Sequence, residues 1–116
     1  MTIREVVSVL DAELCCGEEW LDTQVDSAFC ADLMSDVLAF SGRQQLLLSG
    51  LVNPQVIRTA DLLDMRCIVF VRGKRPTAEM VKLACEKEIV LLSVRKTMYL
   101  AGGLLFAAGM KDGGIN

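Results

Sequence analysis

The sequence contains no histidine, and this absence argues against much of enzyme chemistry. Histidine is the most frequent general base and metal ligand, and it activates the nucleophile in Ser-His and Cys-His pairs. The phosphate-binding motifs G-x-x-x-x-G-K-[ST] and G-x-G-x-x-G are also missing, although nine glycines are present. We therefore expect a protein that is not an enzyme and that holds neither a cofactor nor a metal ion.

Long apolar runs and paired cysteine motifs are missing too. The longest weakly polar stretch, Met98 to Met110, is too short for a membrane helix, which needs about 20 residues. Charges at Arg4, Glu5 and Asp11 interrupt any signal-peptide core. The five cysteines form no C-x-x-C motif, and their odd number argues against a complete disulfide framework. With a net charge of −3, we expect a cytoplasmic protein that binds neither membranes nor nucleic acid.

Aliphatic side chains dominate the composition. Of the 116 residues, 53% are apolar but only 5% are aromatic. This length suits one domain that buries its own core, which we place at residues 1–111, with a flexible glycine-rich tail at 112–116. The apolar excess indicates either a surface covered by a partner or strands that are buried on both faces.

Local patterns predict an alternation of strands and helices. Thr2 and Glu5 form a capping box before an amphipathic helix over 2–10. Strands are expected at 12–16 and 24–30, followed by a short helix at 32–39. The later strands are expected at 45–49, 67–71 and 89–92, with helices that start at Asn53, Thr77 and Thr97. Repeated strand–helix units with short connections predict a three-layer α/β fold with a mainly parallel sheet.

Basic residues follow two of these strands and suggest a binding site. Ligands of open α/β sheets bind at the carboxyl ends of the strands, where helix N-termini also gather. The candidate anion-binding residues are Asn53, Arg72, Gly73, Lys74, Arg75, Thr77, Arg95, Lys96 and Thr97. They predict a site for a nucleotide or another phosphorylated anion, and the alternative is a solvated loop edge with ordinary surface charge.

Two smaller groups each allow two interpretations. Asp32, Ser35 and Asp36 either have a functional role, as ligands of an ion such as Mg²⁺ or in acid/base chemistry, or only cap and charge the first turn of a helix. Gly102, Gly103 and Ala107 keep one side of the last helix small, which favours either a dimer contact or close packing within one chain.

Three segments together resemble the DRTGG domain family. Residues 31–39 (A-D-L-M-S-D-V-L-A) are similar to its S-D-L-L-S-D-V-M-A segment, residues 1–7 resemble its start, and residues 68–76 resemble its strand, T-G-G turn and proline. Within that turn only Gly73 matches, and residues 50–53 (G-L-V-N) lack the family's Asp-Arg. The resemblance covers nearly the whole chain.

The resemblance implies a regulatory domain. DRTGG domains are similar to the N-terminal domain of HPr kinase/phosphorylase, and they occur beside CBS domains in regulated pyrophosphatases and within some phosphotransacetylases. There they are non-catalytic and often dimeric. We therefore expect a homodimeric regulatory module that binds a small anion or docks on a partner enzyme. The alternatives are a dimerisation adaptor without a ligand and, with less support, a small phosphotransferase.

Overall fold

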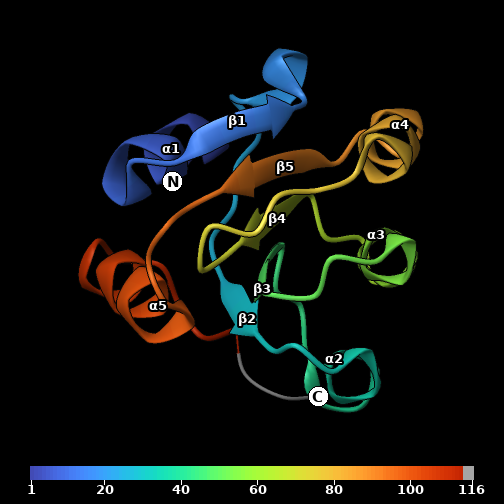
Figure 1. Ribbon diagram of the computed structural model, residues 1–116. Helices are drawn as coiled ribbons and strands as arrows, with labels where there is room; N and C mark the ends of the chain where they lie inside the picture. The colour runs from blue at the N-terminus through green and yellow to red at the C-terminus, as the bar shows by residue number, and fades with distance from the viewer. Residues whose placement is uncertain (114–116) are drawn as a thin grey trace.

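The computed structural model describes residues 1–113 and consists of one sheet with helices on both sides (Figure 1). The five strands are arranged in the order β1-β5-β4-β3-β2. They are β1 (Glu13–Cys16), β2 (Ala28–Cys30), β3 (Leu46–Ser49), β4 (Cys67–Phe70) and β5 (Val90–Ser93). The helices are α1 (Ile3–Leu10), α2 (Met34–Phe40), α3 (Pro54–Leu62), α4 (Ala78–Glu86) and α5 (Met98–Ala107), with a short 3₁₀ turn η1 (Glu18–Trp20).

The helices form two outer layers. Strands β2 to β5 are parallel and lie in chain order, so the right-handed crossovers through α2, α3 and α4 all fall on one face of the sheet. Helices α1 and α5 pack together on the other face (Figure 1). The predicted three-layer α/β fold is confirmed.

Strand β1 is the one antiparallel member of the sheet in the described part of the chain. It pairs with β5 through Glu13–Ser93 and Leu14–Leu92, and its register then shifts before Cys16. This edge position brings the N-terminal segment next to the last strand. The sequence pattern predicted a strand here but not its direction.

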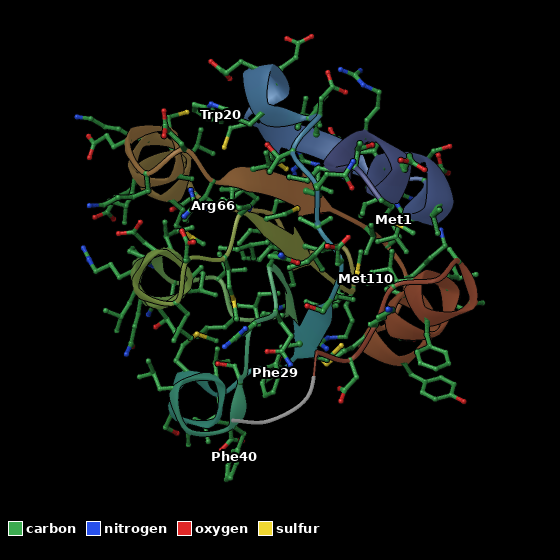
Figure 2. All side chains as sticks on the ribbon, turned by 180° about the vertical axis from the view of Figure 1, so that it is seen from behind. Met1, Trp20, Phe29, Phe40, Arg66 and Met110 are labelled. Atoms are coloured by element: carbon green, nitrogen blue, oxygen red, sulfur yellow. The ribbon has the colours of Figure 1, made fainter. Side chains whose placement is uncertain are left out.

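Two apolar cores lie on the two faces of the sheet. Leu46 and Leu48 of β3 belong to the core beneath α1 and α5, whereas Leu47 belongs to the core beneath α2, α3 and α4. Every residue of β3, β4 and β5 is buried, which explains why these strands appear as continuous apolar runs rather than alternating patterns. Figure 2 shows side chains filling the space on both faces.

Helix starts follow the sequence closely. The Thr2 hydroxyl accepts a hydrogen bond from the Glu5 amide, and the Glu5 carboxylate accepts one from the Thr2 amide, which completes the capping box. The Asn53 side chain caps α3, and the Thr77 and Thr97 hydroxyls cap α4 and α5. These caps orient the helix N-termini as the sequence predicted.

Two elements have different boundaries in the structure from those predicted from the sequence. The strand expected over 24–30 is reduced to Ala28–Cys30, because the preceding residues pair with the chain ends instead of the sheet. The Val25 amide donates to the Met1 carbonyl, and the Lys111 amide donates to the Asp26 carbonyl. Helix α2 begins at Met34, and its N-cap is Leu33, which makes no side-chain capping bond.

The segment after α5 returns to the sheet. Lys111 forms an isolated parallel bridge with Ser27, and the Asp112 carbonyl accepts a 2.6 Å hydrogen bond from the Gln44 side chain. The predicted flexible tail therefore includes a residue with a defined contact, while 114–116 lie outside the described residues. Among residues 1–113, none of the helices has the length and apolar character needed to cross a bilayer.

Candidate functional site

The carboxyl edge of the sheet holds a cavity of about 420 Å³ between the loops after β4 and β5. This volume lies within the range of small-molecule sites. Four residues predicted from the sequence line it: Gly73, Arg75, Arg95 and Lys96. The other lining residues are Asp11, Glu13, Ser93 and Val94.

Backbone bonds fix the two loops to each other. Arg72 and Gly73 both have positive φ angles, 58° and 72°, which reverse the chain after β4. Their amides donate to the carbonyls of Lys96 and Val94 at 2.9 and 2.8 Å. The Ser93 hydroxyl donates to the Lys74 carbonyl at 2.6 Å. The wall of the cavity is therefore preformed, but these two amides are not available to a ligand.

The cationic side chains of the cavity differ in whether they already bind a partner within the chain. Arg75 makes two hydrogen bonds with the Glu13 carboxylate, and the Lys96 ammonium donates to the Leu10 carbonyl at 2.8 Å. The exposed Arg95 makes no hydrogen bond or ion pair with any residue in 1–113. Arg95 is thus the cation most available to an incoming anion.

Two carboxylates reduce the positive charge of the cavity. Asp11 ends α1 in a left-handed conformation, and Glu13 opens β1. The hydrogen bonds and charge of Arg75, together with the charge of Arg95, lower the pKa of Glu13. Three cations and two carboxylates leave the lining with one net positive charge. The site is therefore weakly, not strongly, attractive to anions.

Asp32 and Arg72 meet each other outside this cavity. Their side chains form an ion pair at 3.3 Å, and the other Asp32 oxygen accepts the Gly50 amide at 2.6 Å. The ion pair and the hydrogen bond together join the loops that follow β2, β3 and β4. Asp32 therefore ties loops together, and the interpretation of Asp32 as a helix cap is wrong, because Leu33 occupies the N-cap.

The remaining predicted residues lie around the same edge without lining the cavity. The side chains of Asn53, Thr77 and Thr97 accept hydrogen bonds from their own helices. Ser35, Asp36 and Lys74 are exposed. In residues 1–113, no three His, Cys, Asp or Glu side chains gather in a metal-ligating group.

Helix α5 presents small and apolar residues to the surface. Gly102 is half-buried, and a Cβ built there would lie 3.6 Å from the Cys30 sulfur, whereas a Cβ on Gly103 would meet nothing within 4 Å. Ala107 is exposed. Packing within the chain therefore does not account for Gly103. These glycines help to line an open apolar hollow of about 680 Å³, together with Cys30, Met98, Tyr99 and Phe106.

Three polar residues of the cavity lining were missed by sequence reasoning. Ser93 could have been found, because it is the last residue of a strand whose following loop was already a candidate. Asp11 and Glu13 had no comparable signal, since they reach the cavity only because β1 pairs antiparallel with β5. Strand direction at a sheet edge depends on tertiary packing and not on local sequence.

No protein-family model matches the sequence, and no curated protein matches it. Among solved structures, the chain is similar to the CBS and DRTGG domains of the regulatory region of a Clostridium perfringens pyrophosphatase, solved with its activator diadenosine tetraphosphate. The TM-score is 0.74 at 15% sequence identity. The fold is DRTGG-like. This confirms, for the fold, the resemblance seen in the three sequence segments.

The match covers 99% of this chain but 50% of the other. The chain thus spans half the length of the solved structure that it matches. A DRTGG-like fold provides a sheet edge and a set of loops, and the residues of this chain determine what those loops bind.

Proposed function

We propose that the chain is a non-catalytic regulatory module that binds a nucleotide or another phosphorylated anion in the cavity beside β5. The observation that carries this proposal is the open guanidinium of Arg95 at the rim of a preformed cavity. Thr97 starts α5 directly after Lys96, so the positive end of that helix dipole adjoins the same cavity. An anion there gains a charged donor without any rearrangement of the loops.

The similar structure supports this class of ligand. Its regulatory region is bound to diadenosine tetraphosphate, a dinucleoside polyphosphate that activates that pyrophosphatase. Adenine nucleotides are therefore the first ligands to test on this chain. The same likeness supports a role in controlling a partner enzyme.

We also propose that the module works as a homodimer that packs through α5. Tyr99 is 91% exposed and Phe106 is 73% exposed, although both are large and apolar. Contiguous apolar surface of this kind is unusual on a monomer and typical of an interaction site. Gly103 and Ala107 leave room for a second helix to approach closely. Docking on a partner enzyme would use the same surface.

The binding proposal is tested by calorimetry of the full chain with ATP, diadenosine tetraphosphate and inorganic pyrophosphate. Arg95→Ala should weaken binding about 10- to 100-fold, because one charge-assisted hydrogen bond contributes about 1.5–3 kcal/mol. Arg43→Ala is the matched control, since Arg43 is exposed in the loop before β3, at the opposite edge of the sheet. We expect its affinity to stay within about twofold of the wild type, because only screened long-range charge is lost.

Equal loss in the two variants would indicate general charge attraction and would contradict a site at Arg95. Absence of binding by the wild-type chain, with a dimer in light scattering, would favour the adaptor without a ligand. Turnover of ATP by the pure chain, removed by one point mutation, would favour a phosphotransferase.

A further inference from the structure

A bulge in β1 turns two consecutive cysteines toward the same layer of helices. The pairing with β5 shifts register between Leu14 and Cys16. Neighbouring residues of a regular strand point to opposite faces, yet Cys15 and Cys16 both pack, half-buried, against the core beneath α2, α3 and α4. The bulge therefore places both side chains on the face that β1 shares with α4.

A third cysteine lies near this position. Cys85 is in the last turn of α4, the helix that packs against β1, and its side chain lies close enough to that of Cys16 to influence the pKa of the Cys16 thiol. The Cys16 sulfur also donates to the Ile89 carbonyl at 3.8 Å, which holds it near the end of α4. Cys85 is exposed, so oxidants in solution reach one member of this pair directly.

We propose that Cys16 and Cys85 form a site of oxidative modification, at which a peroxide links the two thiols in a reversible disulfide between β1 and α4. Two residues far apart in the sequence are brought together where β1 packs against the end of α4, and a disulfide requires their sulfur atoms to approach to bonding distance. This inference does not depend on any ligand of the cavity.

The reaction proceeds in two balanced steps. The Cys85 thiolate attacks a peroxide oxygen of H₂O₂, the O–O bond breaks, and the released hydroxide takes up a proton to become water. This leaves a sulfenic acid on Cys85. The Cys16 sulfur then attacks the Cys85 sulfur, the S–O bond breaks, and the hydroxyl leaves with the Cys16 proton as a second water. Two thiols lose two electrons, and one peroxide is reduced to two waters.

The surroundings of the two thiols set the order of these steps. Burial, with a contribution from Cys85, raises the pKa of Cys16 to about 12, so Cys16 remains a thiol until the sulfenic acid forms. Complete burial raises the pKa of Cys67 as well and keeps that thiol away from oxidants. Exposed Cys85 is therefore the first sulfur to react, and Cys16 is the second.

The test exposes the full chain to H₂O₂, alkylates the free thiols, and maps the peptides by mass spectrometry without reduction. We expect a mass lower by two hydrogens, a Cys16–Cys85 linked peptide, and reversal by dithiothreitol. The melting temperature should rise by about 10 °C, because a disulfide that closes a long loop restricts the unfolded chain.

Matched cysteine variants locate the bond. Cys85→Ser and Cys16→Ser should each abolish the link, whereas Cys15→Ser and Cys30→Ser should retain it. A link from Cys85 to Cys15 would overturn the proposal, as would oxidation of Cys85 to the sulfinic acid without any crosslink. Peptide mapping of the wild-type chain decides this even where a serine variant fails to fold.

Discussion

Helices α4 and α5 each follow a parallel strand, but they lie on opposite faces of the sheet and their outer surfaces differ in character. Each begins at a threonine whose hydroxyl accepts a bond from the third amide of the helix. The outward side of α4 carries Glu79, Lys82 and Glu86, all exposed. The outward side of α5 instead carries the exposed residues Tyr99, Leu100 and Phe106.

This difference shows that the fold requires only the inner side of each helix. Met80 and Ala84 of α4 are fully buried, and Ala101 and Leu105 of α5 are buried equally well. The charged outer side of α4 suits water, whereas the outer side of α5 has the composition of an interior. The exposed apolar residues of α5 thus lie away from the core of their own chain, and they form the surface through which we propose that the chain associates.

The largest expected effect is the difference in unfolding free energy between replacing a buried phenylalanine and replacing an exposed one. Phe70→Ala empties a fully buried site beneath α3 and α4 and should lower the free energy of unfolding by about 3–5 kcal/mol. Phe106→Ala, on the outer side of α5, should change it by less than about 0.5 kcal/mol in the monomer. Urea unfolding at low protein concentration measures both. Similar losses would show that Phe106 contributes to the core of its own chain.

The second prediction concerns association. Phe106→Glu places a charge in the apolar hollow beside α5, and burying it in a dimer would carry a large desolvation penalty. We expect the mass measured by light scattering to fall from that of a dimer to that of a monomer. Lys82→Glu on α4 is the matched control and should leave the mass unchanged. A monomeric wild-type chain, or a dimer that survives Phe106→Glu, would argue against an α5 interface.

A smaller loss of stability is expected from a third variant, which tests whether a side-chain hydrogen bond helps to hold the loops before α4 and α5 together. Ser93→Ala removes the hydrogen bond to the Lys74 carbonyl and should destabilise the chain by about 1 kcal/mol. Ser35→Ala, at an exposed position on α2, should be neutral. Thermal unfolding compares the two variants, and hydrogen exchange should show faster exchange of the Arg72 and Gly73 amides only in Ser93→Ala. Unchanged exchange there would mean that the backbone bonds alone hold the loops.

The smallest effect concerns the ion pair between the loop before α4 and strand β1. The hydrogen bonds and charge of Arg75 lower the pKa of Glu13 below its ordinary value of 4.5, so the pair stabilises the fold above about pH 4.5. This contribution is lost as the pH falls through the lowered pKa of the folded state. Glu13→Gln should therefore make the melting temperature less dependent on pH below 4.5. Glu19→Gln, an exposed control in η1, should leave the acid dependence as in the wild type.

Much of this structure was predictable because short-range patterns determine it. The buried runs that became β3, β4 and β5 and the caps at Asn53 and Thr97 depend on neighbouring residues alone. The length of β2 depends on whether residues 24–27 pair with the sheet or with the chain ends, and no local pattern distinguishes these outcomes.

The candidate site was predictable to the same extent. The rule that ligands bind at the carboxyl ends of parallel strands pointed to this edge of the sheet, where Gly73, Arg75, Arg95 and Lys96 line one cavity. It could not show that Arg72 would turn to Asp32, because that choice depends on loops from three strands meeting in space. Nor could it show that Glu13 of β1, which is 62 residues away in the sequence, would pair with Arg75.

The pairing of Lys111 with Ser27 has a consequence for how copies of this chain can meet. Strand β2 is one of the two outer strands of the sheet, and a bare outer strand offers its backbone as a template for strands of other molecules. Here the Asp26 carbonyl and the Ala28 amide are already bonded to Lys111. Growth of the sheet from one molecule into the next is blocked at these residues, so this edge of the sheet is protected from ordered aggregation.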